Sequence, residues 1–277
     1  MPAATLEIGG PLLLVGCGKM GGALLGGWLE RGAPAAAITV VEPQEANLAP
    51  FAGRGLVHLR APESLAPDYA PAAVVFAVKP QQMDVAVPKY GRFVRPETVF
   101  LSIAAGKTIA YYERRLGAAA AIVRAMPNTP AAVGRGMSVL CANAQASEAQ
   151  RAVCGALLSA VGEVAWVEDE ALLDPVTAVS GGGPAYVFLL IECLARAGVE
   201  AGLPADLAMR IARATVAGAG ELVHRAAEPA STLRENVTSP GGTTIEAIEV
   251  LMAPGGLQDL MTRAIAAATE RSRELAS

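Results

Sequence analysis

The sequence predicts an α/β fold for the first part of the chain and an all-helical fold for the rest. Up to about residue 165, short continuous runs of Val, Ile and Leu alternate with segments of helical spacing. This alternation is typical of a parallel sheet that is covered on both faces. Later in the chain, apolar residues recur every three and four positions, which is the helical period. We therefore expect a boundary near residues 163–168, with domains at 1–165 and 166–277.

The expected elements follow from these two patterns. Strands are predicted at 11–16, 37–42, 72–80, 98–106, 121–126 and 137–143. The order of strands and helices predicts a doubly wound sheet, in which the first strand leads into a helix at 21–32. Helices in the second domain are predicted at 171–180, 184–204, 205–228, 244–254 and 257–275. The helix over 184–199 is apolar on nearly all sides, so it is buried either within its own monomer or in a subunit interface.

Composition excludes several classes of protein. The chain has 277 residues, of which 53% are hydrophobic, and 22 Lys and Arg against 26 Asp and Glu, so it lacks the basic excess of a nucleic-acid-coating protein. The longest apolar runs are shorter than the ~20 residues of a membrane-spanning helix, and no signal peptide is visible. Four separated cysteines and two histidines indicate neither a metal site nor a disulfide framework. We expect a cytoplasmic protein without a metal, a membrane or a nucleic-acid partner.

A glycine-rich segment joins the first expected strand to the first expected helix. Gly16, Gly18 and Gly21 have the G-x-G-x-x-G spacing. In that context the first glycine allows a tight turn, the second lets the backbone approach a pyrophosphate, and the third lets helix and strand pack closely. The N-terminus of the helix supplies free N–H groups for the phosphate charge. The segment predicts a Rossmann-type domain that binds a dinucleotide.

An acidic residue, Glu42, ends the second expected strand. A carboxylate there can accept hydrogen bonds from both ribose hydroxyls of NADH and would repel the 2′-phosphate of NADPH. The alternative is a solvated charge at a strand end. Arg54 or Arg60 could also reach a 2′-phosphate and weaken the preference for NADH.

Three further strand ends are candidates for lining the cofactor, because ligands of open α/β sheets bind at the carboxyl ends of the strands. They are Ala77–Pro80, Ile103–Gly106 and the two-proline turn 126–130, which would hold Asn128 in place. The alternative for each is an ordinary loop at the end of a strand.

A glycine-rich loop over 236–244 precedes a helix in the second domain. Its consecutive glycines expose backbone N–H groups, and Thr243 or Thr244 could cap the helix. Such a helix start attracts a carboxylate, although the same pattern also fits an ordinary N-cap. The helical domain has no lysine, and His224 is its one histidine. Oxidation of an alcohol needs a strong general base, usually His or Lys, whereas reduction of a C=N bond needs mainly positioning. The scarcity of such bases in the helical domain therefore favours reduction of a C=N bond.

Several segments, taken together, resemble the pyrroline-5-carboxylate reductase family. In chain order they are LLLVGCGKMGGALLGGWL, FAVKP, LSIAAGKTI, IVRAMPNTPAAVGRGM, AVSGGGPAYVFLLIECLARAGVEAGLP and ENVTSPGGTTIEAIEVL. The resemblance extends from about residue 12 to residue 275. It implies a C-terminal dimerisation domain, a dimer that can assemble further into a decamer, and reduction of 1-pyrroline-5-carboxylate to L-proline by NADPH or NADH, the last step of proline biosynthesis.

The resemblance also implies roles for individual residues. On the cofactor side they are Gly16, Gly18, Lys19, Met20, Ala77, Val78, Lys79, Pro80, Ala104, Ala105, Asn128 and Asn236. Cys17 and Gly21 of the glycine segment, and Glu42 at the strand end, complete the expected cofactor-binding residues. On the substrate side Ser239, Gly241, Gly242 and Thr243 form a carboxylate cradle, and the hydroxyl of Thr244 hydrogen-bonds the ring nitrogen as the catalytic group.

The sequence departs from the family pattern at two positions. Gly182 replaces a serine of the usual SGSGPAY segment, and Glu42 stands where NADPH-preferring members often carry a small hydroxyl residue. Two alternative functions are a cofactor-binding scaffold or sensor of the same fold, and a hydroxy-acid dehydrogenase. The intact SPGGTT loop opposes the first alternative, and the absence of lysine from the helical domain opposes the second.

Overall fold

The computed structural model describes Leu6 and residues 8–276, which divide into two compact units. The first unit extends to Gly181 and also includes the last residues of the chain, from Ala268 onward. The second unit is Gly182–Ala267. This division falls later than the predicted boundary near residues 163–168, because Leu173 and Ala178 are buried and Leu173 belongs to the core of the first unit.

A mixed eight-stranded sheet forms the first unit, in the order β3-β2-β1-β4-β5-β6-β7-β8. The strands are β1 (Leu12–Val15), β2 (Ile38–Val41), β3 (Val57–Leu59), β4 (Ala73–Phe76), β5 (Val99–Ser102), β6 (Ala121–Met126), β7 (Gly136–Ala142) and β8 (Gly162–Trp166). The chain leaves β1 toward β2 and β3 and then returns to β4 on the other side of β1. The strand order therefore reverses between β1 and β4, which is where doubly wound sheets bind ligands.

The α/β prediction is confirmed, with two differences in the sheet. Strands β6 and β7 are antiparallel, whereas the other pairs are parallel. The connection over 127–135 is too short for the crossover that a parallel pair requires. Strands β3 and β8 were not predicted, because both are partly exposed and lack a continuous apolar run.

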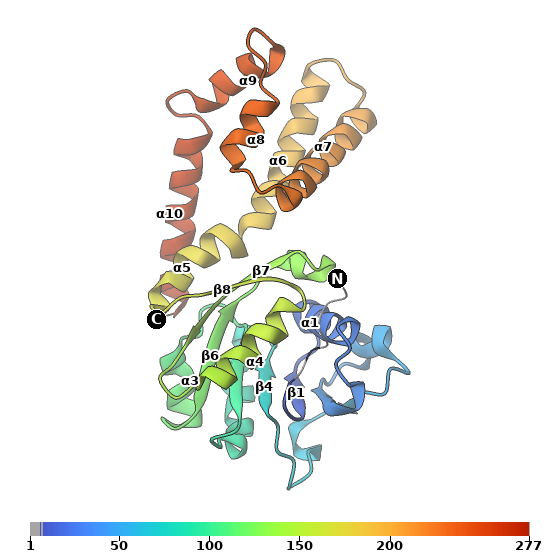
Figure 1. Ribbon diagram of the computed structural model, residues 1–277, viewed down its shortest axis with the longest axis vertical. Helices are drawn as coiled ribbons and strands as arrows, with labels where there is room; N and C mark the ends of the chain where they lie inside the picture. Colours follow the sequence, from blue (N-terminus) through green and yellow to red (C-terminus); the bar gives the residue numbers. More distant parts are fainter. Residues whose placement is uncertain (1–5, 7, 277) are drawn as a thin grey trace. The chain divides into compact units, whose positions relative to one another are not determined.

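Helices cover both faces of this sheet (Figure 1). They are α1 (Lys19–Glu30), α2 (Met83–Ala86), α3 (Ile109–Leu116), α4 (Glu148–Ser159) and α5 (Leu173–Val176), with 3-10 helices at Ala35–Ala37, Glu45–Phe51, Pro62–Ser64, Pro80–Gln82, Val87–Phe93, Thr129–Val133 and Glu170–Leu172. Alternate residues of β1 separate the two cores, since side chains alternate between the faces of a strand. Leu12 and Leu14 belong to the same core cluster as Trp28 of α1, whereas Leu13 and Val15 belong to the cluster that contains Tyr112 of α3.

The second unit is helical, as predicted. It contains α6 (Gly183–Glu200), α7 (Ala205–Arg225), α8 (Ala230–Asn236), α9 (Thr243–Met252) and the first part of α10 (Leu257–Ala276). The short α8 was not predicted, and a π-helical turn at Thr177–Gly181 precedes α6. Of the hydrophobic side chains in this unit, all of which the structure describes, only those of Ala195, Ala208 and Ala212 are buried.

Helix α6 is therefore not buried within its own monomer. Phe188 and Leu189 on it are 60% and 55% exposed, and α9 exposes Leu251 and Met252. The helical stretch Glu170–Glu200 is also long and apolar enough to span a membrane by length and composition alone. Of the two alternatives for α6, exposure on this scale favours a subunit interface, because monomeric proteins rarely leave large apolar patches open to water.

Candidate active site

The glycine loop lies at the switch point of the sheet, between β1 and α1. Gly16 has a φ of +89°, and a Cβ atom there would lie 2.6 Å from Cγ1 of Val78. A Cβ on Gly21 would lie 2.4 Å from the carbonyl oxygen of Gly16, whereas one on Gly18 would meet nothing within 4 Å. The first and third glycines are thus required by the fold itself. Gly18 borders open space, as expected of the position where a ligand approaches the backbone.

The loop also presents the start of α1 without a side-chain cap. Gly18 is the N-cap residue, and as a glycine it has no side chain to accept a hydrogen bond from the first N–H groups of the helix. Uncapped N–H groups and the helix dipole together make such a helix start suitable for a phosphate group. This geometry is compatible with the anion site that the sequence predicts.

Glu42 is buried, with 5% of its surface exposed, and lies directly after β2. Its Oε2 accepts the backbone N–H of Cys17 at 2.7 Å, and its Oε1 accepts the N–H of Gln44 at 2.9 Å. The alternative of a solvated strand-end charge is therefore wrong. Each carboxylate oxygen retains further acceptor capacity, so the same group can also receive a ribose hydroxyl.

Cys17, in the middle of the glycine loop, is a structural thiol. Burial, and then the negative charge of Glu42, raise the pKa of the Cys17 thiol from 9.0 to about 11. The thiolate is the nucleophilic form, so this side chain is unreactive at neutral pH. Its predicted contribution to cofactor binding is limited to its backbone.

The end of β4 lies against the glycine loop. The Ala77 N–H donates to the carbonyl oxygen of Val15 at 2.8 Å, and the Val78 side chain lies beside Gly16. Lys79 is exposed and Pro80 begins a 3-10 helix. The structure therefore brings Ala77 and Val78 together with the glycine loop at the carboxyl ends of the neighbouring strands β1 and β4.

Ala104 and Ala105 follow the neighbouring strand, β5. The Ala104 N–H donates to Oγ of Ser102 at 3.2 Å, and Ser102 in turn shares a short hydrogen bond with the hydroxyl of Tyr112. These buried polar contacts hold the start of the loop. The segment ends at Gly106, which has a φ of +70°.

Asn128 makes three side-chain hydrogen bonds to other parts of the first unit. Its Oδ1 accepts the N–H of Met137 at 2.8 Å. Its Nδ2 donates to the carbonyl oxygen and to Oγ of Ser180, at 3.3 and 3.2 Å. The amide thus joins the turn after β6 to the π-helical turn before α6. Sequence reasoning missed this partner, which lies 52 residues away along the chain.

The remaining predicted residues lie in the second unit, around the start of α9. Asn236 ends α8, Ser239 lies in the following turn, and Gly241 has a φ of +69°. Gly242, rather than Thr243 or Thr244, is the N-cap of α9, and no side chain caps the helix. The expected threonine cap is therefore wrong: both threonines fall inside the first turn because Gly242 takes the extended conformation of the cap position.

The start of α9 combines three features of a carboxylate site. The loop is exposed, its backbone turns sharply at Gly241, and the first N–H groups of the helix have no side-chain acceptor. An uncapped helix start carries a partial positive charge that favours an anion. The hydroxyl groups of Thr243 and Thr244 belong to the same turn.

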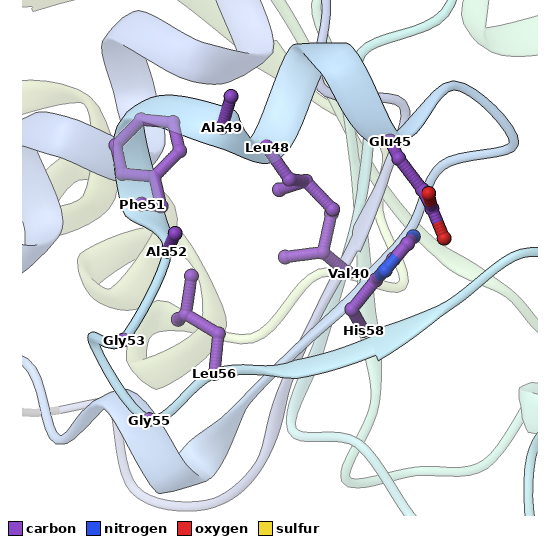
Figure 2. Close-up of a pocket in the computed structure, with 10 residues that line it drawn as sticks. All are labelled: Val40, Glu45, Leu48, Ala49, Phe51, Ala52, Gly53, Gly55, Leu56 and His58. Carbon is purple, nitrogen blue, oxygen red and sulfur yellow. The ribbon is translucent and has the colours of Figure 1, made fainter.

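A cavity of about 340 Å³ lies elsewhere in the first unit, between β2, β3 and the 3-10 helix Glu45–Phe51 (Figure 2). Its walls are mainly apolar, with Glu45 and His58 at one side: Val40, Glu45, Leu48, Ala49, Phe51, Ala52, Gly53, Gly55, Leu56 and His58. None of these is a predicted site residue. Among Leu6 and residues 8–276, no three His, Cys, Asp or Glu side chains group as metal ligands would.

A doubly wound sheet with an uncapped glycine loop at its switch point and a buried acid after β2 defines a class, the NAD(P)-dependent oxidoreductases. The family model for NADP oxidoreductases, coenzyme F420-dependent, matches residues 12–106. The model for pyrroline-5-carboxylate reductase dimerisation matches residues 170–275.

Curated relatives identify the family within this class. The pyrroline-5-carboxylate reductase of Pseudomonas aeruginosa is 42% identical over 96% of both chains, and that of Pisum sativum is 36% identical over 94% of both. The chain belongs to the pyrroline-5-carboxylate reductase family.

Solved structures agree with this assignment. A pyrroline-5-carboxylate reductase from Coxiella burnetii has a TM-score of 0.89 at 33% identity, covering 97% of this chain and 99% of its own. The Plasmodium falciparum pyrroline carboxylate reductase, solved with NADP bound, has a TM-score of 0.80 at 28% identity, covering 98% and 100%. The protein is thus an NAD(P)H-dependent oxidoreductase that acts on a C=N bond, and its dimerisation domain makes it a homo-oligomer.

Proposed function

We propose that this protein reduces 1-pyrroline-5-carboxylate to L-proline with NADPH or NADH, the last step of proline biosynthesis. The observation that carries the proposal is the 42% identity to a reductase of that name over 96% of both chains. The open glycine loop and the uncapped start of α9 support it, because the reaction needs one anion site for a pyrophosphate and one for a carboxylate.

On the cofactor side, the backbone of Gly16–Gly21 and the start of α1 receive the pyrophosphate. Glu42 accepts a ribose hydroxyl while its hydrogen bond to Cys17 keeps the loop in place. Ala77–Pro80 and the pair Ala104 and Ala105 line the ribose and nicotinamide, at the carboxyl ends of β4 and β5. Asn128 and Asn236 are the remaining residues for which we propose contact with the cofactor. The bound cofactor supplies the hydride.

On the substrate side, the start of α9 holds the carboxylate. Ser239, Gly241, Gly242 and Thr243 form the cradle, and the dipole of α9 favours its negative charge. Thr244 lies in the same turn. The family resemblance assigns its hydroxyl to a hydrogen bond with the ring nitrogen. Such positioning suffices for an imine, because its nitrogen is readily protonated and the carbon beside it is electrophilic.

The family relation makes the protein a homo-oligomer, and we propose a dimer that can assemble into a decamer. The exposed apolar face of α6, with Phe188 and Leu189, supports the dimer because its burial removes apolar surface from water. Light scattering at several protein concentrations tests the assembly. A mass of one chain at micromolar concentration would contradict it. A cytoplasmic location remains a prediction.

The activity is tested by following oxidation of NADH and of NADPH in parallel, with purified protein and 1-pyrroline-5-carboxylate. We expect rapid turnover with at least one cofactor and formation of proline in equal amount. The ratio of the two rates measures the effect of Glu42 in the same experiment. Cofactor binding without turnover would contradict the proposal and favour the sensor alternative.

A further inference from the structure

The last residues of the chain return to the first unit. Residues from Ala268 onward, in the C-terminal part of α10, belong to that unit, and Thr269 and Ser272 are buried at 9% and 6% exposure. Ser272 donates from Oγ to Oδ1 of Asp174, at 2.7 Å. Asp174 lies in α5, so this hydrogen bond joins segments that are 98 residues apart along the chain.

The following turn of α10 lies directly against the loop after β5. A Cβ atom on Gly106 would be 3.0 Å from the carbonyl oxygen of Leu275 and 3.3 Å from its Cβ. The side chain of Leu275 is 57% exposed, so the contact is a close approach of two backbones and not the burial of an apolar side chain. The φ of +70° favours glycine at position 106, and the close approach leaves little room for a side chain there.

The same loop is held from its other end. Lys107 places its Nζ 3.8 Å from Oδ2 of Asp84 in α2 and 4.5 Å from the centre of the Tyr111 ring. At the start of the loop, the Ala104 N–H donates to Ser102. Between these two contacts, Gly106 has the end of α10 as its neighbour.

We propose that the end of α10 is a positioning element for the cofactor loop Ala104–Gly106. Ser272 fixes the helix on Asp174, and the backbone of Leu275 then limits the movement of Gly106, one residue from Ala105. Holding a binding loop in its bound conformation lowers the entropy lost on binding. The affinity for the dinucleotide therefore depends on the C-terminal turn of the chain. This inference rests on the proposed role of Ala104 and Ala105 in cofactor binding.

Two variants weaken the restraint of α10 on the loop Ala104–Gly106, each by removing a different contact. Ser272→Ala deletes the hydrogen bond to Asp174, and a chain that ends at Glu274 deletes the backbone that lies on Gly106. Ser272→Thr restores the hydroxyl and should restore the wild-type behaviour. Arg271→Ala is the matched control, because Arg271 is exposed and pairs only with Glu274 on the same helix among the contacts described here.

The primary measurement is the Kd for NADPH and for NADH, from fluorescence titration without substrate. We expect Ser272→Ala and the shortened chain each to raise the Kd of the preferred cofactor roughly fivefold, because a less restrained loop loses more entropy on binding. The cofactor KM should rise in parallel, while kcat at saturating cofactor and the KM for 1-pyrroline-5-carboxylate stay within a factor of about two, as a loss of binding affinity predicts. Arg271→Ala should leave all four values unchanged.

Other outcomes overturn the inference. If the folded variants bind the cofactor with unchanged Kd, the inference is wrong. A lower thermal midpoint together with an unchanged Kd would mean that α10 only stabilises the fold. If Ser272→Ala does not fold, the shortened chain decides the question by the same Kd. A wild-type protein that binds NADPH but does not turn over would contradict the proposed reaction and leave the comparison of Kd values valid.

Discussion

The carboxylate of Glu42 accepts the backbone N–H of Cys17, with 2.7 Å between Oε2 and the nitrogen. This hydrogen bond joins the end of β2 to the middle of the glycine loop, 25 residues earlier in the chain. A charged acceptor makes a stronger hydrogen bond to a backbone amide than a neutral one does. One side chain therefore holds the glycine loop, and it is the same side chain for which we propose contact with the adenosine ribose of the dinucleotide.

Replacing Glu42 should change the choice of cofactor. Glu42→Ser removes the negative charge that repels a 2′-phosphate, so we expect the ratio of kcat/KM for NADPH to that for NADH to rise roughly tenfold. Glu42→Gln is the matched variant, because it removes the charge and keeps an acceptor oxygen for Cys17. Initial rates with both cofactors measure the ratio. An unmoved ratio in both variants would show that Glu42 does not touch the ribose.

The glycines of the loop should respond differently to alanine. Gly18→Ala should fold normally, since a Cβ there meets nothing within 4 Å, and should bind the dinucleotide at least ten times more weakly because the methyl group occupies the approach path. Gly21→Ala should lower the thermal midpoint, because its Cβ would lie 2.4 Å from the Gly16 carbonyl oxygen. Calorimetry and cofactor titration separate the two effects. Equal loss of stability in both variants would contradict this prediction.

Removing the hydroxyl of Thr244 should slow the reaction. Thr244→Ala is expected to lower kcat about 100-fold, the usual size of a lost proton-donating group, and to leave the Kd for the cofactor nearly unchanged. Thr262→Ala on the exposed face of α10 is the control, with unchanged turnover expected. Steady-state kinetics at saturating cofactor is the measurement. Full turnover by Thr244→Ala would remove this residue from the mechanism.

The Cys17 thiol should make the protein sensitive to alkali. Its pKa is raised from 9.0 to about 11 by burial first and by Glu42 second. The contribution to stability is complete below pH 9 and is lost as the pH rises from 9 to about 11, because the unfolded thiol ionises first. We expect the free energy of unfolding to fall by about 2 kcal/mol over that range. Cys17→Ala should show a smaller fall in denaturant titrations, and an equal fall would contradict the assignment.

An ion pair between buried Arg124 and partly buried Glu170 should matter for folding. Arg124, 4% exposed at its side chain, places Nη1 2.8 Å from Oε1 of Glu170, and the same oxygen accepts the Ile109 N–H at the start of α3. Glu170→Ala leaves a buried guanidinium without its partner, so the free energy of unfolding should fall by about 3 kcal/mol.

The control for the ion pair is the double variant Arg124→Met with Glu170→Leu. It should lose less stability than Glu170→Ala, because no charge is then left buried. Urea denaturation compares the variants. A loss below about 1 kcal/mol for Glu170→Ala would mean that water solvates Arg124 after the change.

The local pattern of the sequence predicted most of the fold and the glycine loop. Strands β1 and β4 are continuous apolar runs, and α6 and α7 repeat apolar residues at helical intervals. Each of these elements can therefore be recognised from a short stretch of sequence. The short strands β3 and β8 and the helix α8 were missed, because partly exposed short elements have no strong period. The N-cap of α9 was also misplaced, since which residue adopts the extended cap conformation depends on the turn before it.

The sequence by itself indicated the α/β and the all-helical parts of the chain, the dinucleotide loop and the family. Only the tertiary structure decided the partners of Asn128, the burial of Glu42 against Cys17, and the return of Ser272 to Asp174. The reason is physical. Periodicity and turn chemistry act between residues that are close along the chain, whereas these hydrogen bonds join residues 25 to 98 positions apart and form only when the sheet and its helices have packed.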